Sequence, residues 1–319
     1  MKRKVLVVAL ILCVLMPLAV FAGGKKEAPA GKMKIGYVVK DNTGDYWKIV
    51  QAGAMAAGRD FDVEVLYNGP NAETEVMQQV SMMEDMITKK VAALVVAPSQ
   101  PKAAISVFNQ ANAAGIPVLL ADTDADWDKK ITFLGTGNEA AGKIGGKYIA
   151  EKLGAGSEIV IVRGALGDLT HDQRSNGAAE AAKAAGCKVV DIQPADSDMA
   201  KAMDVMENMI QAYPNIKGVF CTSDAMAVGA NRAVEKSGKN IMVIGFDAIP
   251  VAVEEIMKGK TFKGSVAQSP YNIGYMGVEN AIKAAKGEAV NKRIDTGAKM
   301  IDASNVQAYS DDLKKMLGK

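Results

Sequence analysis

The chain has 319 residues and a formal net charge of +2, from 38 Lys and Arg against 36 Asp and Glu. A nearly neutral chain without basic clusters lacks the electrostatic footprint for nucleic acid or an anionic membrane, so neither is an expected partner. The single histidine, His171, excludes a multi-histidine metal site, and no Gly-x-Ser-x-Gly motif accompanies it. We therefore expect no metal, no cofactor and no catalytic residues, and we interpret His171 as a residue of the surface or rim.

Residues 1–22 are predicted to be an export signal. MKRK is a basic start, residues 5–18 are an apolar run, and Val20-Phe21-Ala22 has the small-x-small pattern of a cleavage site. Its removal takes away three basic residues and leaves 35 against 36 acidic ones, a net charge of −1. Residues 23–32 are predicted to be a flexible leader. We expect a periplasmic or otherwise extracytoplasmic protein, with a retained membrane anchor as the alternative.

From Lys34 onward, short β-branched runs alternate with amphipathic helical stretches, a pattern typical of parallel sheets covered on both faces. Five strands are predicted first, at 34–39, 63–67, 93–97, 117–121 and 131–135. The helix before the third has apolar residues three or four apart, which predicts a buried face formed by Val76, Val80, Met83 and Ile87. The pattern then starts again, with strands at 158–164, 188–192, 218–222, 241–246 and 264–267. The repeated plan predicts an α/β fold of two tandem doubly wound lobes.

The end of the chain predicts how the lobes are joined. The fifth strand of the first lobe lacks a helix of its own, and a predicted helix at 270–285 can supply it. This predicts three crossing strands, side by side, that form a hinge near residues 136–138, 268 and 297. The expected first lobe is then 33–136 plus 269–297, and the second is 137–268 plus 298–319.

The stretch LGTGNEAAGKIGG, residues 134–146, resembles two nucleotide-binding motifs. A dinucleotide fingerprint belongs in the first strand–helix turn of its sheet, but these glycines follow a fifth strand. In a phosphate loop, Ile144 would stand where a hydroxyl must bind magnesium. We therefore interpret the stretch as a crossing between lobes, with Asn138 capping the next helix.

Two cysteines remain after processing, Cys187 and Cys221, and both are expected to be free thiols. Their strands are second and third in the second lobe, so the first strand of that lobe should lie between them. Their Cα atoms would then be about two strand spacings apart, or roughly 9–10 Å, which is too far for a disulfide.

Polar loops follow the predicted strands, and in wound α/β sheets ligands bind beyond the carboxyl ends of the strands. The chemistry in these loops is carboxylates, an arginine, hydroxyls and two adjacent aromatics. Asp accepts hydrogen bonds from neighbouring hydroxyls, Arg donates in a planar fork, and a flat ring packs on the apolar face of a sugar. This set favours a small polyhydroxylated ligand. The loops are DNTGDYW, DTDADWD, RGALGDLTHDQR, TSDAM, FDAIP and AQSP.

Over residues 34–300 the sequence resembles the ribose-binding protein family, the class I periplasmic sugar-binding proteins of ABC importers. The specific segments include VVAPSQPKA, GNEAAGKIGGKYIAEKLG, QPADSD, SDAMAVGA, VIGFDAIP and GSVAQSPYNIG. The resemblance implies the type I periplasmic binding protein fold. It also implies ligand-binding roles for acids Asp122 and Asp247, Arg174, the hinge amide Gln268, and the aromatics Tyr46 and Trp47.

The sequence also departs from the family's pattern. Gly44 replaces an Asn, Thr123 an Arg, Ser197 an aromatic and Ser223 an amide. These replacements imply a ligand shaped differently from ribose. The DTD run with Trp127 nearby is more similar to the glucose- or polyol-binding branches. The complete set of candidate ligand-binding residues is Asp122, Arg174, Asp247, Gln268, Tyr46, Trp47, Asn138, Thr123, Ser197, Ser223 and Lys40.

The function we expect is capture of a monosaccharide or sugar alcohol between two closing lobes, followed by delivery to a membrane ABC permease. The alternative is a sensor that feeds a chemoreceptor or histidine kinase. The sugar repressors share the fold, but they carry an N-terminal DNA-binding motif where this chain has an export signal. An enzyme acting on sugars would need a pair of catalytic groups that the sequence does not provide.

Overall fold

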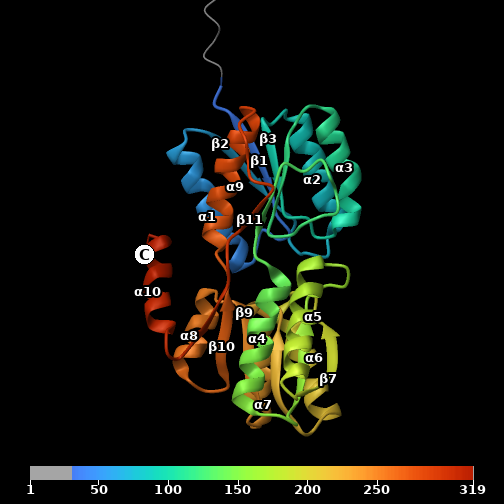
Figure 1. The fold of residues 1–319 in the computed structure, drawn as a ribbon, viewed down its shortest axis with the longest axis vertical. Helices are drawn as coiled ribbons and strands as arrows, with labels where there is room; N and C mark the ends of the chain where they lie inside the picture. Colours follow the sequence, from blue (N-terminus) through green and yellow to red (C-terminus); the bar gives the residue numbers. More distant parts are fainter. Residues whose placement is uncertain (1–30, 319) are drawn as a thin grey trace, which may run out of the picture. The chain divides into compact units, whose positions relative to one another are not determined.

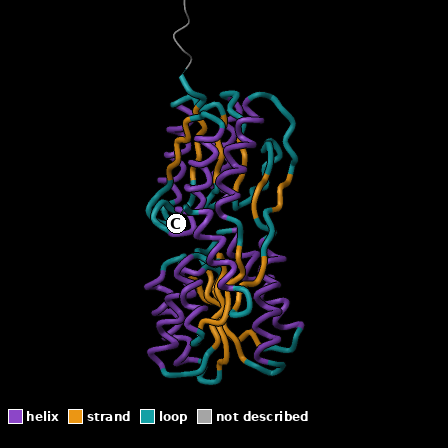
Figure 2. The backbone as a smooth tube through the Cα atoms, turned by 90° about the vertical axis from the view of Figure 1, so that its left-hand side faces the viewer, coloured by secondary structure: helices purple, strands orange, loops and turns teal. Residues whose placement is uncertain are grey.

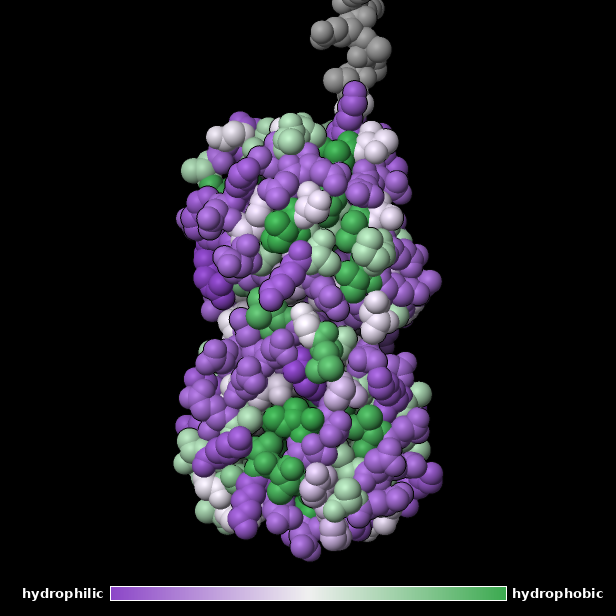
Figure 3. Space-filling view, turned by 90° about the vertical axis from the view of Figure 1, so that its right-hand side faces the viewer, coloured by the Kyte–Doolittle hydropathy of each residue, from purple (hydrophilic) through white to green (hydrophobic). Residues whose placement is uncertain are grey.

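The computed structural model describes residues 31–318, so the predicted export signal and nearly all of the leader lie outside the described residues. From Lys32 onward the chain forms one compact unit (Figure 1). That unit contains two six-stranded sheets, each covered by helices on both faces (Figure 2). We call the two halves built on these sheets the first lobe and the second lobe. The space-filling view shows a waist between them and a mainly hydrophilic surface (Figure 3).

The first sheet has the order β11-β5-β4-β3-β1-β2, and its strands all pair in parallel. Its strands are hydrophobic on both sides, because helices cover both faces. The elements that build this lobe before the first passage to the second are β1 (Lys34–Val38), α1 (Asp45–Asp60), β2 (Glu64–Asn68), α2 (Val76–Thr88), β3 (Ala93–Val96), α3 (Pro101–Ala113), β4 (Val118–Ala121) and β5 (Phe133–Gly135).

The second sheet repeats the plan in the order β12-β10-β9-β8-β6-β7. Its elements are α4 (Asn138–Leu153), β6 (Glu158–Arg163), α5 (Leu169–Ala184), β7 (Lys188–Pro194), α6 (Met199–Ala212), β8 (Ile216–Cys221), α7 (Asp224–Ser237), β9 (Met242–Asp247), α8 (Pro250–Lys258) and β10 (Phe262–Ala267). All ten predicted strands are therefore present, and the two-lobed α/β prediction is confirmed. Cys187 and Cys221 are buried free thiols, and β6 lies between their strands as expected.

The last part of the chain serves both sheets. The helix predicted at 270–285 is α9 (Pro270–Ala285), and it packs on α1 and on the strands of the first sheet. It is followed by β11 (Arg293–Asp295), β12 (Lys299–Asp302) and α10 (Val306–Met316). Strand β11 pairs with β5, and β12 pairs with β10. The chain therefore passes between the sheets three times, after β5, after β10 and between β11 and β12.

A third crossing strand was predicted near residue 297, but not its division into β11 and β12. Strand β12 is antiparallel to β10, so the second sheet is not wholly parallel, contrary to the prediction. The reason is the direction of entry. Strand β10 runs toward the passage between the lobes, whereas the chain leaves β11 and enters the second lobe through that same passage. A strand that continues straight on must run opposite to β10.

Two of the glycines in residues 134–146 are explained by helix packing. A Cβ atom on Gly142 would overlap the backbone carbonyl of Arg174, and one on Gly146 would overlap that of Ala178. Gly177 of α5 lies equally close to the backbone of α4 at Glu139. Glycine therefore lets the backbones of α4 and α5 touch, which a larger residue would prevent. The glycine at the second glycine position of the phosphate-loop near-match, Gly142, follows from this packing.

Replacing Gly146 with Ala is expected to destabilise the protein by about 1–3 kcal/mol, because the added methyl group must push α5 away. The sign is informative, since Gly→Ala inside a helix otherwise stabilises by roughly 0.5–1 kcal/mol. The measurement is urea unfolding followed by circular dichroism. Gly137→Ala is the matched control, because its Cβ would meet only the Asp295 carboxylate, at 3.6 Å. A Gly146→Ala protein as stable as the original would contradict this account.

Candidate ligand-binding cleft

A pocket lies between the lobes, where the carboxyl ends of strands from both sheets face each other. The first lobe contributes the loop after β1, the start of α1, and single residues before α2 and after β4. The second lobe contributes the first turns of α5 and the loops before α6, α7 and α8. The lining residues are Lys40, Asp41, Gly44, Asp45, Tyr46, Trp47, Glu73, Asp122, Thr170, His171, Arg174, Ser197, Ser223, Ala225, Asp247 and Ile249.

Asp122 is the acid of the first lobe, directly after β4. It is buried, and its backbone has φ of +62°, a left-handed conformation that Asp tolerates better than most residues. Its carboxylate accepts hydrogen bonds from the Tyr46 hydroxyl at 2.8 Å and from Thr123 Oγ1 at 3.0 Å. Two neighbours thus fix the orientation of Asp122 before any ligand arrives.

Arg174 is the guanidinium of the second lobe, on α5. Its Nε donates to Asn138 Oδ1 at 2.8 Å and its Nη1 to the Thr222 carbonyl at 3.0 Å. The guanidinium carbon lies 4.0 Å from the ring centre of Phe246. The expected capping role of Asn138 is wrong. Helix α4 has Gly137 at its N-cap without a side-chain hydrogen bond, because the Asn138 side chain is turned toward Arg174 instead.

Asp247 follows β9 and faces Arg174. Its Oδ1 accepts a hydrogen bond from Gln268 Nε2 at 2.6 Å and lies 3.6 Å from Arg174 Nη1. Burial raises the pKa of Asp247 to about 6, with Arg174 and Gln268 opposing that rise and Asp122 adding to it. Its φ of +114° is unusual for a residue other than Gly. The carboxylate is thus held in an unfavourable place, which is typical of a functional site.

Two polar atoms beside these groups have no hydrogen-bond partner in the described chain. They are Ser223 Oγ, which lines the pocket, and Gln268 Oε1, next to Asp247. A buried polar atom left unpaired costs about 1–3 kcal/mol. Of the two, Ser223 Oγ lies where a ligand in the pocket could pair with it.

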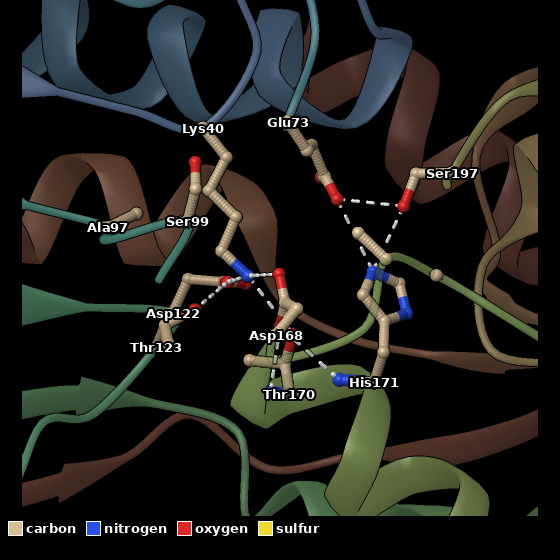
Figure 4. A network of polar contacts seen from close by, with 12 residues as sticks. Lys40, Glu73, Ala97, Ser99, Asp122, Thr123, Asp168, Thr170, His171 and Ser197 are labelled. Atoms are coloured by element: carbon tan, nitrogen blue, oxygen red, sulfur yellow. Dashed lines mark hydrogen bonds and ion pairs between the residues drawn. The ribbon is translucent and has the colours of Figure 1, made fainter. Parts of the chain in front are cut away.

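Lys40 connects the two lobes directly (Figure 4). Its Nζ donates to Asp168 Oδ2 at 2.6 Å and to Thr170 Oγ1 at 3.1 Å, and it lies 3.7 Å from Asp122. Burial would lower the pKa of Lys40, but the charges of Asp168, Asp122 and Glu73 raise it above its ordinary value. Burial likewise opposes ionisation of Asp168, yet Lys40 and His171 hold its pKa well below the usual range. The pair is therefore ionised.

A second polar bridge joins Glu73 of the first lobe to His171 and Ser197 of the second. Glu73 accepts from Ser197 Oγ at 2.7 Å and lies 3.4 Å from His171 Nε2. Burial alone would raise the pKa of Glu73, but the hydrogen bond with His171 and the charge of Lys40 lower it. His171 is buried on the first turn of α5, and its Nδ1 is 2.8 Å from Thr222 Oγ1. The interpretation of His171 as a surface or rim residue is therefore wrong.

Three side chains each have one possible metal-ligand atom, and these atoms lie within 4.8 Å of one another, a spacing that suits a metal ion. They are Glu73, Asp168 and His171. Lys40 Nζ is already bonded to Asp168 and supplies positive charge at that point. A divalent cation would have to displace this ammonium, so the ion pair explains the acidic cluster without a metal.

Of the eleven candidate residues, eight line the pocket: Lys40, Tyr46, Trp47, Asp122, Arg174, Ser197, Ser223 and Asp247. The other three lie behind it as supports: Thr123 bonds Asp122, Asn138 bonds Arg174, and Gln268 bonds Asp247.

The DTD run contributes only Asp122 to the pocket lining. Trp127 packs on Phe108 in the core, with its Nε1 donating to Asn109, and Asp124 pairs with Lys130. The expected link between this run and the glucose- or polyol-binding branches therefore has no support in the pocket.

Sequence reasoning missed Glu73, Asp168 and Thr170. Asp168 caps α5 by accepting from the backbone of Thr170 at 2.8 Å, and the Asp-x-Thr spacing was a signal for that cap. Glu73 lies in the loop between β2 and α2, and no motif marks it.

Residues 35–289 match the model of the family described as periplasmic binding protein domain. The chain is 32% identical to the Ribose import binding protein of Bacillus subtilis (strain 168), with 88% of each chain covered. A carbohydrate transporter solute binding protein from Agrobacterium radiobacter, solved in complex with D-arabinose, is similar with a TM-score of 0.84 and 32% identity. That match covers 89% of this chain and 99% of the other. An ABC transporter solute binding protein from Bacillus halodurans with bound myo-inositol has a TM-score of 0.82 and 28% identity, over 88% and 98% of the two chains.

The raised pKa of Asp247 predicts a loss of stability of the ligand-free protein as the pH rises. In the unfolded chain the carboxyl ionises near its ordinary value of 3.8, whereas in the folded protein it stays protonated up to about 6. Between pH 3.8 and about 6, unfolding therefore releases a proton from this carboxyl. The free energy of unfolding falls by up to about 3 kcal/mol across that range, and at higher pH this contribution is constant.

An Asp247→Asn variant lacks this titration. Its free energy of unfolding relative to that of the original protein should therefore rise from pH 4 to pH 7, as measured by urea unfolding at several pH values. A difference that is independent of pH would contradict the assignment.

Proposed function

We propose that this chain, which belongs to the periplasmic binding protein family, captures a monosaccharide or sugar alcohol between its lobes and delivers it to a membrane ABC importer. The observation that carries the proposal is the set of oriented polar groups in the cleft. Asp122 and Asp247 approach from opposite lobes, and Arg174 is fixed by Asn138 and Thr222. Such an arrangement suits a ring of hydroxyl groups, which both donate and accept.

The charge of the pocket supports a neutral ligand. Five acids line it, namely Asp41, Asp45, Glu73, Asp122 and Asp247, against the two bases Lys40 and Arg174. Both bases already have carboxylate partners, so neither is available to neutralise an anion. A sugar phosphate or a sugar acid would bring further negative charge next to the buried carboxylates of Asp122 and Asp247, which is unfavourable. A neutral sugar or polyol avoids that cost.

Two aromatics supply the apolar surface that such a ligand also needs. Tyr46 and Trp47 begin α1 and meet edge to face, with ring centres 5.0 Å apart. Trp47 is almost fully buried, and the Tyr46 hydroxyl is bound to Asp122. A flat apolar wall beside hydrogen-bonding groups is the usual composition of a small-molecule site.

The names of the similar proteins support the same ligand class, since they concern ribose, D-arabinose and myo-inositol. They also name import and transporter functions, whereas the sensor alternative finds no support among them. The family is one of binding proteins, and we propose no catalytic role for this chain.

Membership of this family places the protein outside the cytoplasm. We propose that residues 1–22 direct its export, although they lie outside the described residues. Within residues 31–318, no helix is both long and apolar enough to cross a bilayer.

We further propose that the three passages between the lobes act as a hinge. Each is short: residues 136–137, 268–269 and 296–298. A few backbone torsions there can rotate one lobe relative to the other while both cores stay packed. A ligand held by both lobes would favour the closed arrangement, because its contacts with the two lobes are complete only in that arrangement.

The expected ligands are tested by thermal shift with pentoses, hexoses and polyols, followed by titration calorimetry. A ligand at 100 times its dissociation constant adds about 2.7 kcal/mol of stability. Asp122→Ala and Asp247→Ala should each lose about 1–3 kcal/mol of binding, because ligand hydroxyls remain unpaired in a buried site. Arg174→Lys should also bind more weakly, since an ammonium does not reproduce the planar fork.

Asp124→Ala is the matched control for Asp122→Ala. It belongs to the same run but pairs with Lys130 outside the pocket, so its affinity should equal that of the original protein. Unchanged affinity in both Asp122→Ala and Asp247→Ala would remove these residues from the site. If no neutral sugar or polyol binds, the proposed function itself is wrong.

The hinge proposal predicts that a saturating ligand makes the protein more compact. The measurement is small-angle X-ray scattering with and without the sugar or polyol that calorimetry identifies. The radius of gyration should decrease on binding, because ligand contacts with both lobes favour closure. Identical scattering profiles, with binding confirmed in the same samples, would exclude closure by a hinge.

A further inference from the structure

A second cavity adjoins the ligand-binding cleft. The two share Glu73 and Ser197 as lining residues, together with others near the start of α1 and of α8. The second cavity has a volume of about 330 Å³ and is lined in part by exposed residues, such as Thr43, Asn71 and Asp198. It therefore opens toward solvent, whereas the residues around Asp122, Arg174 and Asp247 are buried.

Glu73 and Ser197 line both cavities, and His171, which lines only the cleft, contacts both of them. Glu73 reaches from the first lobe and Ser197 from the second, and their side chains meet at 2.7 Å. His171 Nε2 is 3.1 Å from Ser197 Oγ and 3.4 Å from Glu73 Oε2 (Figure 4). The Glu73 side chain is 11% exposed, so its charge is largely removed from water. We call this group the partition.

The backbone at Ser197 shows that the partition is held in place at some cost. Asp196 has φ of +52° and Ser197 φ of +59°, so two successive residues other than Gly adopt the left-handed conformation. Each such residue costs on the order of 1 kcal/mol and persists only where its surroundings enforce it. Asp198 then caps α6 by accepting from the backbone of Lys201, and Asp196 pairs with the Lys201 side chain. These contacts fix the strained loop that presents the Ser197 hydroxyl to Glu73.

We propose that the partition is the specificity-determining element of the cleft and limits the ligand to a single free sugar ring or polyol. This inference depends on the function proposed above. A glycoside whose substituent extends from the cleft past Glu73 and Ser197 would place it in the second cavity, and the partition lies in that direction. Opening it would separate Glu73 from Ser197 and His171 and leave a largely buried carboxylate without its partners, which is costly. A free ring that pairs with Asp122, Arg174 and Asp247 carries no substituent that must pass the partition.

The test compares affinities for free and substituted ligands in partition variants. The probes are D-ribose and D-arabinose, each with the methyl and phenyl glycosides of both anomers, and myo-inositol with galactinol. The quantity measured by calorimetry is the ratio of dissociation constants, substituted over free. We expect a large ratio for the original protein and a decrease of roughly tenfold or more in the Glu73→Ala/Ser197→Gly double variant, because discrimination is a difference of two affinities.

Two further variants keep the test decisive. Glu73→Gln preserves the shape of the partition and can still accept from the Ser197 hydroxyl, but it removes the buried charge, so its ratio should lie between that of the original protein and that of the double variant. Ser197→Gly alone suits the positive φ and removes only the hydroxyl, so it tests the partition if the double variant does not fold. Its ratio should also fall.

Two results would overturn the inference while leaving the proposed function intact. One is an original protein that binds glycosides as tightly as free rings. The other is a folded double variant that binds the free ring yet rejects every substituted probe as strongly as the original does. If the original protein binds none of the free sugars or polyols of the wider panel, the proposed function fails and this inference fails with it.

Discussion

The buried ammonium of Lys40 is the constraint on which the cleft depends. Nearly all of this side chain is shielded from water, and a buried charge is tolerated only when it is paired and hydrogen-bonded. Asp168 and Thr170 of the second lobe supply those partners, with Asp122 of the first lobe nearby. Because Lys40 follows β1 in the first lobe, its requirement for partners is met only when the lobes approach each other. The ion pair therefore links the electrostatics of the site to the arrangement of the two halves, and any ligand binds in the space that remains.

In the second lobe, the packing of α4 on α5 determines the position of Arg174. Gly142 lets the backbone of α4 touch the carbonyl of Arg174, so the position of this arginine is set by main-chain contact. A side-chain hydrogen bond adds to this contact, because Arg174 Nε donates to Asn138 Oδ1 on the first turn of α4. A bulkier residue at Gly142 would move both the helix and the guanidinium. The glycine-rich stretch therefore positions Arg174 in the cleft, by helix packing and not by cradling a phosphate.

The sequence predicted those features that depend on local patterns. Ten strands and α9 follow from hydrophobic runs and turn residues, and the resemblance located Asp122, Arg174 and Asp247. The features that were missed depend on contacts between distant segments. Helix α2 buries Gln79 with Met83 and Met86, whereas Val76 and Val80 are only partly buried, because the Gln79 amide joins the carbonyls of Val39 and Ala97. His171 and Glu73 shield each other from water by their contact across the cleft. No periodicity in either segment predicts this contact.

The cleft thus contains groups of two kinds, and their balance determines what a ligand must contribute. Lys40, Asp168, Glu73, His171 and Ser197 are satisfied by one another across the lobes, so they favour closure without a ligand. Three other residues are buried without using all of their hydrogen-bonding capacity, so they oppose closure: Asp247, Ser223 and Gln268. Closure buries these atoms without full hydrogen bonding, which costs free energy. A molecule that forms hydrogen bonds with them removes this cost, and the gain adds to its free energy of binding. A molecule of similar size without hydroxyls gains nothing there. On the proposed function, we therefore expect discrimination between ligands to arise from the atoms that the protein leaves unsatisfied.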